Sequence, residues 1–297
     1  MATPDRRPGD FAFRPLRKPE EFRHAEELQR EALGSEEVLA VPSPLLRSIQ
    51  DNGGLVLGAF ADIYLAGVTV SSIGWDGATL YHQSLVTAVR PEYQNHRVGL
   101  RLKALQRDEV LRLGLGEVRW AFDPLQRAAA SLAVRHLGAR PDAYLPNYHG
   151  HLGATDRPRD ESDRLHVRWA LRGAEVERRL GGELPRPEDD LRRHAFSSAV
   201  VETEPGESGL RLPSAVAEPS GPTASLEIPF DLGSIRVHEP GSVRRWRHAV
   251  RDGFRAALDL GYAVEDFATV SVEHERRCFY FLSPSPTAGN GPPSVPG

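Results

Sequence analysis

A polar loop between two apolar segments contains the residues whose types and spacing could do chemistry. It spans residues 94–99, Gln-Asn-His-Arg-Val-Gly. Side chains of Gln94, Arg97 and Arg101 could donate hydrogen bonds around it, and Gly99 has no side chain to keep a ligand from the backbone. If a helix begins here, its first amides lack partners within the helix. Together with the helix dipole they attract an anion, typically a phosphate.

The segments on either side are predicted to hold this loop between a strand and a helix. Residues 80–89 form an alternating apolar segment, which is typical of a strand, and Pro91 breaks the extended pattern. After the loop, apolar residues recur at the spacing of one helical face: Val98, Leu102, Leu105, Val110 and Leu113. Gly114 is expected to end this helix. The sequence therefore predicts a strand, a tight loop with an anion site, and a helix.

The rest of residues 1–171 predicts a mixed sheet with helices on its faces. The expected strands are residues 11–16, 55–60, 64–72, 80–89, 117–122 and 165–171, with a further extended piece around 143–148. The expected helices are residues 19–33, 45–52, 98–113 and 126–137. The fold class expected is therefore α/β (α+β).

The C-terminal part divides into three regions by composition. Residues 172–225 are rich in Glu, Arg, Pro, Ser and Gly, and only His194–Val201 looks like a strand, so a long connection with little core is expected. Residues 226–282 predict a smaller β-α-β-β unit around a helix at 242–260. Residues 283–297 are rich in Pro, Gly and Ser and are expected to be disordered.

Composition excludes several classes of protein. The chain has 297 residues, 40% hydrophobic and 26% charged, with a formal net charge of -4 and no block of like charge, which argues against nucleic-acid binding. Lys18 and Lys103 are the only lysines among 37 basic residues. One cysteine, Cys278, allows no intrachain disulfide and no thiolate metal cluster, and it lies in an apolar run expected to be core. No signal peptide or membrane span is recognisable, so a cytoplasmic location is expected.

The segment Val89–Leu100, VRPEYQNHRVGL, resembles motif A of the GNAT superfamily of acyl-CoA N-acyltransferases. Gln94, Val98 and Gly99 match the motif, whereas Arg97 stands where its first glycine usually is. Further segments resemble one uncharacterised GNAT subgroup: residues 118–125, 137–139, 147–150, 163–165 and Trp246-Arg247. The resemblance implies a GNAT acyltransferase domain over residues 1–171, with a mainly antiparallel sheet flanked by helices.

The resemblance also implies a cofactor and its site. The co-substrate would be acetyl-CoA or another acyl-CoA; subgroup members are linked to N-succinylation of amino acids, so succinyl-CoA is included. Thr87, Ala88 and Val89 would hold the pantetheine by main-chain bonds, as in the family. The pyrophosphate would lie against the loop and first helical turn: Gln94, Asn95, His96, Arg97, Val98, Gly99, Leu100 and Arg101. The acceptor would be a small amine or amino acid, acylated directly in a ternary complex.

Three residues are candidates for catalysis. Tyr148 is the first candidate for the general acid that protonates the CoA thiolate, and Tyr144 is the second; either ring could instead be a core aromatic. Asp123, at the end of a predicted central strand, could order the amine or act as a base, or simply form an Asp-Pro turn. The pair His149 and His151 has no third ligand at metal-binding spacing, so no metal is expected.

Three points remain open from the sequence. The subgroup usually carries Arg-Asn-Ala and a later Asn after its Asp-Pro-Leu, where this chain has Arg127-Ala128-Ala129 and Ser131. With Arg97, these departures favour an alternative, a GNAT-like domain that binds acyl-CoA or a partner without turnover. The arginine stripe Arg244, Arg247, Arg251 and Arg255 could be solvated, or face an acceptor carboxylate or a partner subunit. The C-terminal unit could cap the acceptor site or build a homodimer.

Overall fold

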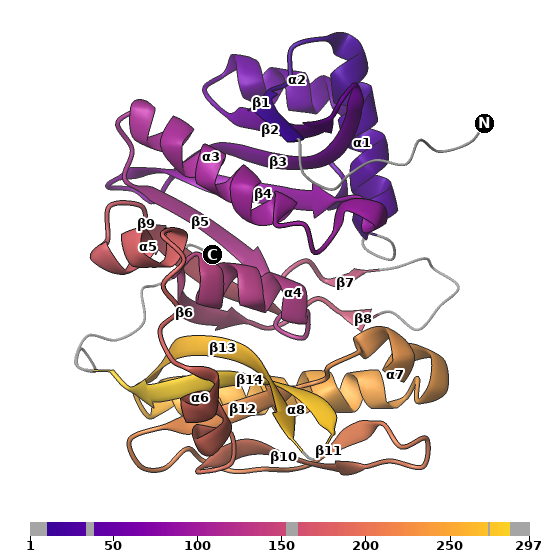
Figure 1. Cartoon of the computed structure of the whole chain (residues 1–297), viewed down its shortest axis with the longest axis vertical. Helices are drawn as coiled ribbons and strands as arrows, with labels where there is room; N and C mark the ends of the chain where they lie inside the picture. The colour runs from indigo at the N-terminus through magenta and orange to yellow at the C-terminus, as the bar shows by residue number, and fades with distance from the viewer. Residues whose placement is uncertain (1–10, 34–38, 153–159, 273, 286–297) are drawn as a thin grey trace. The chain divides into compact units, whose positions relative to one another are not determined.

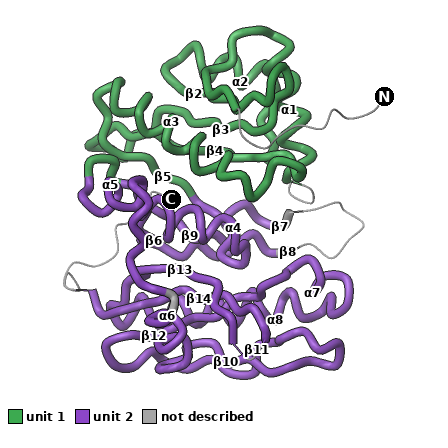
Figure 2. Tube along the Cα trace, in the orientation of Figure 1, with its two compact units in different colours: residues 1–120, 152–157, 170–172 green, residues 121–151, 158–169, 173–297 purple. Residues whose placement is uncertain are grey.

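The computed structural model describes residues 11–33, 39–152, 160–272 and 274–285. The chain forms two compact units. Figure 2 shows unit 1, residues 1–120, 152–157 and 170–172, in green, and unit 2, residues 121–151, 158–169 and 173–297, in purple. The first division falls within a strand, after Trp120, and a later one falls after Arg172, near the composition change.

Unit 1 is built on a sheet with helices on both faces. Its strands lie in the order β1 (Phe11–Pro15), β2 (Leu55–Ala61), β3 (Tyr64–Trp75), β4 (Leu80–Val89) and β5 (Glu117–Phe122). Neighbours are antiparallel from β1 to β4, and β4 and β5 are parallel. The helices are α1 (Pro19–Leu33), α2 (Ser43–Asp51), the 3-10 turn η2 (Pro91–Tyr93) and α3 (Val98–Arg112).

Alternation along β2 explains why these helices lie on opposite faces. Val56 packs in one apolar cluster with Phe22 of α1, whereas the next residue, Leu57, packs in another with Val98 and Leu102 of α3. Because successive strand residues point to opposite faces, α1 and α3 cover different sides of the sheet. Figure 1 shows α3 lying along β3 and β4.

Unit 2 contains a second, five-stranded sheet. Its order is β11 (Arg211–Val216), β10 (Ala199–Pro205), β12 (Ala224–Ile228), β14 (Glu275–Pro284) and β13 (Tyr262–Val272). Within the described residues of this sheet, β10 and β12 pair in parallel and the other neighbouring strands are antiparallel. Unit 2 also holds the antiparallel pair β6 (Arg140–Leu145) and β9 (Arg164–Ala170), and the short pair β7 (His151–Leu152) and β8 (Asp160–Glu161).

The helices of unit 2 are α4 (Arg127–Ala130), continued by the π-helical stretch η3 (Ser131–His136), then α5 (Ala174–Leu180), α6 (Glu188–His194), α7 (Leu232–His238) and α8 (Ser242–Asp259). Two of them, α8 and α6, pack on opposite faces of the five-stranded sheet. Phe254 of α8 packs against Tyr280 of β14, with ring centroids 5.1 Å apart. Leu191 of α6 packs with Phe279 and Phe281, which alternate with Tyr280 and so face the other side.

The expected fold class is confirmed: helices flank mainly antiparallel sheets, and an extra sheet lies in the C-terminal part. The expected helices over 19–33 and 242–260 and the strand over 80–89 are confirmed to within two residues. The expected helix over 126–137 is present as α4 and the π-helical stretch η3.

Residues 172–225 differ from the expected connection with little core. They form α5, α6, β10 and β11, and the last two belong to the five-stranded sheet. The strand expected at His194–Val201 lies further along the chain, because α6 ends at His194 and β10 begins at Ala199. These elements have few apolar side chains, but the ones present are buried, for example Leu191, Val200 and Leu212. At the C-terminus, β14 extends to Pro284, and residues 286–297, expected to be disordered, lie outside the described residues.

Candidate functional site

The predicted strand, loop and helix are present as β4, residues 90–97 and α3. Among the described residues, β4 pairs with β5 only through His82 with Val118 and Gln83 with Arg119. The opposite edge of β4 continues to pair with β3 as far as Val89. From Ser84 to Val89, therefore, one edge of β4 is not hydrogen-bonded to β5. An extended ligand can pair with such an edge through main-chain bonds.

A bulge interrupts β4 where this edge begins. Val70 pairs with Val86 and Ser71 with Ser84, so that Leu85 is an extra residue on β4 without a partner on β3. A bulge of this kind leaves the inserted residue outside the ladder and bends the strand locally. The backbone amide of Leu85 therefore does not contribute to the regular pairing of β3 and β4. The side chain of Leu85 is 44% exposed.

The loop after β4 is shaped by two residues with left-handed backbone conformations. Asn95 has a φ of 64° and Arg97 a φ of 58°, and α3 begins immediately afterwards at Val98. The amide of Arg101 donates to the carbonyl of Arg97 at 3.0 Å. Within the described part of the chain, no hydrogen bond is recorded for the successive amides from Asn95 to Leu100. Successive free amides at a helix start form a concave site for an anion.

The side chain of Gln94 contacts the strand that precedes the loop. Its Nε2 donates to the carbonyl of Val89 at 3.1 Å and so fastens the loop to the end of β4. The ring Nδ1 of His96 lies 2.8 Å from the carbonyl oxygen of Gln94. These contacts fix the loop from within and, among the described residues, leave its backbone amides from Asn95 to Leu100 without a recorded protein partner.

Arg97 occupies a conformation that favours glycine. A non-glycine residue at this φ costs on the order of 1 kcal/mol. We expect Arg97→Val to be about 1–2 kcal/mol less stable than Arg97→Gly in urea unfolding, because a β-branched residue tolerates positive φ poorly. The same pair of substitutions at Arg101, inside α3, serves as the control. There glycine should be no better than valine, since glycine is the poorer helix former. Equal stabilities of the two Arg97 variants would contradict the assigned strain.

Asp123, expected to order the amine or act as a base, lies in a buried ion pair in unit 2. Its Oδ1 and Oδ2 accept hydrogen bonds from the guanidinium of Arg247 at 2.5 and 3.1 Å. Oδ1 also accepts the amide of Leu125 at 3.0 Å. Both side chains of the pair are only 4% exposed. Both oxygens of this carboxylate are therefore already occupied as hydrogen-bond acceptors.

Tyr144 is also engaged with another residue. Its hydroxyl donates to Oδ2 of Asp163 at 2.7 Å, and its ring stacks on Phe254. Burial, and then the negative charge of Asp163, raise the pKa of the Tyr144 hydroxyl well above its usual value. A hydroxyl with a raised pKa gives up its proton less readily. This arrangement makes Tyr144 a weaker candidate for the general acid than Tyr148.

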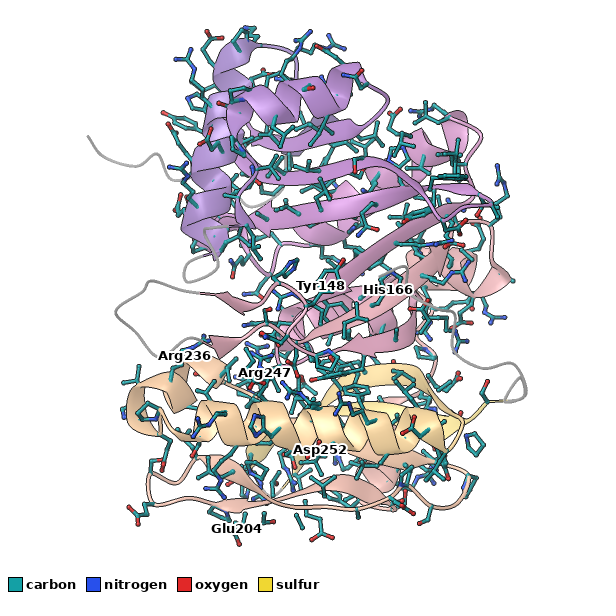
Figure 3. All side chains as sticks on the ribbon, turned by 180° about the vertical axis from the view of Figure 1, so that it is seen from behind. Tyr148, His166, Glu204, Arg236, Arg247 and Asp252 are labelled. Atoms are coloured by element: carbon teal, nitrogen blue, oxygen red, sulfur yellow. The ribbon has the colours of Figure 1, made fainter. Side chains whose placement is uncertain are left out.

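Tyr148 has the exposed side chain expected of a residue that meets a ligand. It lies between β6 and β7, and Figure 3 labels it together with Arg247 on α8. The side chain is 52% exposed, and its ring packs edge-on against His149, with centroids 4.7 Å apart. Within the described residues, no hydrogen bond is recorded for its hydroxyl.

The arginine stripe on α8 divides into two kinds of residue. Arg247 pairs with Asp123, and Arg251 donates to both oxygens of Asp163 at 2.7 and 2.8 Å and also to Glu161. Arg244 and Arg255 are exposed. Two of the four therefore bind carboxylates of their own chain, an outcome that spacing along the helix alone does not predict.

Lys103, on the buried face of α3, is a residue that the sequence reasoning did not select. Its Nζ donates to Oγ of Ser84 at 2.7 Å and to Oε1 of Gln106 at 3.0 Å. Only 2% of the residue is exposed, and burial lowers the pKa of its amine to about 7. Two signals could have identified it. It is one of two lysines in an arginine-rich chain, and it sits next to Leu102 of the apolar face.

Across the described ranges, no group of three or more His, Cys, Asp or Glu side chains is placed to hold a metal ion. None of the helices in those ranges is both long enough and apolar enough to span a bilayer. Cys278 is buried, as expected for a core residue, with its Sγ 3.2 Å from the hydroxyl of Thr269.

No protein-family model and no curated protein matches the sequence. Solved acetyltransferase structures do match part of the chain. The ribosomal-protein-S18-alanine N-acetyltransferase from Escherichia coli is 18% identical, with a TM-score of 0.45, over 56% of this chain and 96% of that one. The GNAT-family acetyltransferase from Streptococcus pneumoniae is 13% identical, with a TM-score of 0.44, over 54% and 98%.

A third match is yncA from Salmonella typhimurium, whose structure contains its cofactor acetyl-CoA. It is 18% identical, with a TM-score of 0.44, over 55% of this chain and 96% of that one. The likeness is one of fold. It covers just over half of this chain, and at these identities and TM-scores nothing about substrate or activity follows from it.

Proposed function

We propose that the chain is an acyl-CoA-dependent N-acyltransferase that binds its donor in unit 1, along β4 and the loop before α3. One observation carries this proposal. The unpaired edge of β4, residues 84–89, leads directly into a loop whose successive amides have no recorded protein partner. An acyl-CoA has a matching order of groups, because its amide-containing pantetheine arm ends in a pyrophosphate.

Each part of the donor has a candidate partner. The amides from Asn95 to Leu100 and the start of the α3 dipole would bind the pyrophosphate. Main-chain groups of Thr87, Ala88 and Val89 would pair with the pantetheine arm as an added strand does. The backbone amide of Leu85, outside the β3–β4 ladder, would polarise the thioester carbonyl and stabilise the negative charge that develops on its oxygen.

The reaction would be direct attack of an amine on the thioester. The amine nitrogen forms a bond to the carbonyl carbon, and the carbon–sulfur bond breaks with its electrons on sulfur. The amine loses a proton and the CoA thiolate gains one. The acceptor would be a small amine or amino acid, and the acyl group acetyl or a related group such as succinyl. No covalent enzyme intermediate is required, since the two substrates react in a ternary complex.

Tyr148 would be the proton donor to the departing thiolate. Replacing it by phenylalanine keeps the ring and removes the hydroxyl. We expect Tyr148→Phe to lower kcat about 10²-fold, within the usual range for general acid catalysis, with unchanged affinity for CoA. Steady-state kinetics and calorimetry measure the two quantities. Tyr81→Phe, an equal change on β4, is the control, and a kcat for Tyr148→Phe equal to that of the wild type would exclude the role.

The donor site is tested by calorimetric titration with CoA and with acetyl-CoA. Micromolar to millimolar binding is expected, and the charge reversal Arg101→Glu in the first turn of α3 should weaken it about tenfold. Arg112→Glu makes the same change at the other end of the helix and should leave the affinity unchanged. If wild-type protein releases no heat with millimolar CoA, the proposed function is wrong.

A binding domain without turnover is the second candidate function. The observation in its favour is that two of the three catalytic candidates are hydrogen-bonded within the protein. Asp123 accepts from Arg247, and Tyr144 donates to Asp163. Thiol release from acetyl-CoA in the presence of a broad panel of amines separates the two functions. Release that depends on an amine supports the transferase, whereas tight CoA binding without release over the whole panel supports the binding domain.

A further inference from the structure

The buried lysine of α3 lies where two parallel strands separate. Strands β4 and β5 pair at His82 with Val118 and at Gln83 with Arg119. The next residue on β4 is Ser84, and the next on β5 is Trp120. Lys103 contacts both: its Nζ donates to Oγ of Ser84 at 2.7 Å and lies 4.3 Å from the centroid of the Trp120 ring. We call this place, defined by Ser84, Lys103 and Trp120, the fork.

The hydrogen bonding of the fork is incomplete. The side chains of His82 and Gln106 are fully buried, yet Nε2 of each has no hydrogen-bond partner. His82 uses its Nδ1 with the hydroxyl of Ser71, and Gln106 uses its Oε1 with Lys103. Buried polar atoms without partners are costly, and in native proteins each calls for an explanation. One of these residues, Gln106, hydrogen-bonds to Lys103, and the other, His82, lies two residues before Ser84 on β4. The hydrogen bonding around the buried amine is therefore not optimised for stability.

The choice of lysine has a chemical meaning. A buried guanidinium cannot lose its proton, whereas a buried ammonium can become a neutral amine. Among the described residues, the hydrogen bonds of the Lys103 amine go to Ser84 and Gln106 and to no carboxylate. Burial lowers the pKa of His82, two residues before Ser84 on β4, to about 4, which keeps it neutral. Lys103 can therefore remain at the fork as an uncharged hydrogen-bonding group, at a cost in stability that an apolar side chain would not incur.

We propose that Lys103 is a positioning residue for the donor: it holds β4 and β5 apart at the fork, so that the edge of β4 beyond Ser84 stays open for the acyl-pantetheine arm. This inference rests on the proposed function. Lys103 need not touch the donor; it acts through Ser84, which precedes the bulge at Leu85, and through Trp120. Without the amine, β4 and β5 would be free to pair further, which would close the edge.

The test compares stability with donor binding. Lys103→Met keeps a long side chain but removes the amine, and Lys18→Met, at an exposed position, is the matched control. We expect Lys103→Met to unfold at the same or a higher temperature than wild type near pH 7, and to bind CoA at least about tenfold more weakly in calorimetry. Lys18→Met should change neither quantity. Ser84→Ala, which removes the β4 contact and keeps the lysine, should also weaken CoA binding.

The outcomes separate the roles. A lower unfolding temperature together with weaker binding of Lys103→Met would show that the lysine merely supports the fold and would overturn the inference. Wild-type affinity in Lys103→Met, or in Ser84→Ala should the first variant not fold, would overturn it as well. In either case CoA binding by the wild type would still support the proposed function. Absence of CoA binding by the wild type would instead refute both.

Discussion

Asp123→Leu is expected to destabilise the protein by about 3–5 kcal/mol, the usual cost of leaving a buried charge without its partner. The substitution leaves the guanidinium of Arg247, 4% exposed, with no counter-charge from residue 123. It also removes the acceptor for the amide of Leu125. The loss should appear as a lower midpoint in urea unfolding, followed by the fluorescence of Trp169 and Trp246, which are both fully buried in unit 2.

A double variant and a surface pair provide the controls. Asp123→Leu combined with Arg247→Met should recover most of the lost stability, because both charges are then absent and the side chains that replace them are apolar. Breaking the exposed pair of Arg47 and Asp51 with Asp51→Ala should cost less than about 1 kcal/mol. If Asp123→Leu is no more harmful than Asp51→Ala, the pair is not structural, and a catalytic role for Asp123 regains support.

The stability difference between wild type and Lys103→Met should depend strongly on pH. Burial lowers the pKa of Lys103 from 10.5 to about 7. Between these values the folded protein holds a neutral amine while the unfolded chain still binds the proton, so the wild type gains stability as pH rises. The gain is up to about 1.4 kcal/mol for each pH unit in this window, and the methionine variant lacks it.

The measurement is urea unfolding of both proteins at several values between about pH 7 and pH 10. The advantage of the methionine variant should be largest near pH 7 and shrink as the pH rises. Other groups titrate equally in both proteins and cancel in the difference. Lys18→Met, exposed in the folded state, should give a difference from wild type that does not vary with pH. A constant difference for Lys103→Met would show that the lysine keeps an ordinary pKa.

Local patterns were sufficient to predict elements that bury one continuous face. The helix α8 is an example, because Val243, Trp246, Val250 and Phe254 recur at helical spacing and are all buried. Residues 172–225 could not be predicted in this way. Strands β10 and β11 bury few side chains each. They pair with each other, and β10 also pairs with β12, whose other partner, β14, lies far along the sequence. Pairing between distant segments leaves no periodic signal in either one.

The same distinction applies to the candidate site. The strand–loop–helix unit was predictable because Pro91, the polar loop and Gly114 are local signals. The early end of β4–β5 pairing and the bulge at Leu85 depend on the register of three strands, which the sequence of β4 alone does not encode. The sequence allowed two roles for Asp123, a turn residue or a catalytic base. Its buried partner, Arg247, bears on this choice and lies 124 positions away, so no local pattern reveals it.

The division of the chain into two units limits how this protein could have been assembled from smaller parts. The chain passes from one unit to the other after residues 120, 151, 157, 169 and 172. A gene fragment ending near residue 171 would therefore encode β6 and β9 without the rest of their compact unit. Because no single cut separates the units, recombination could not readily exchange either one intact.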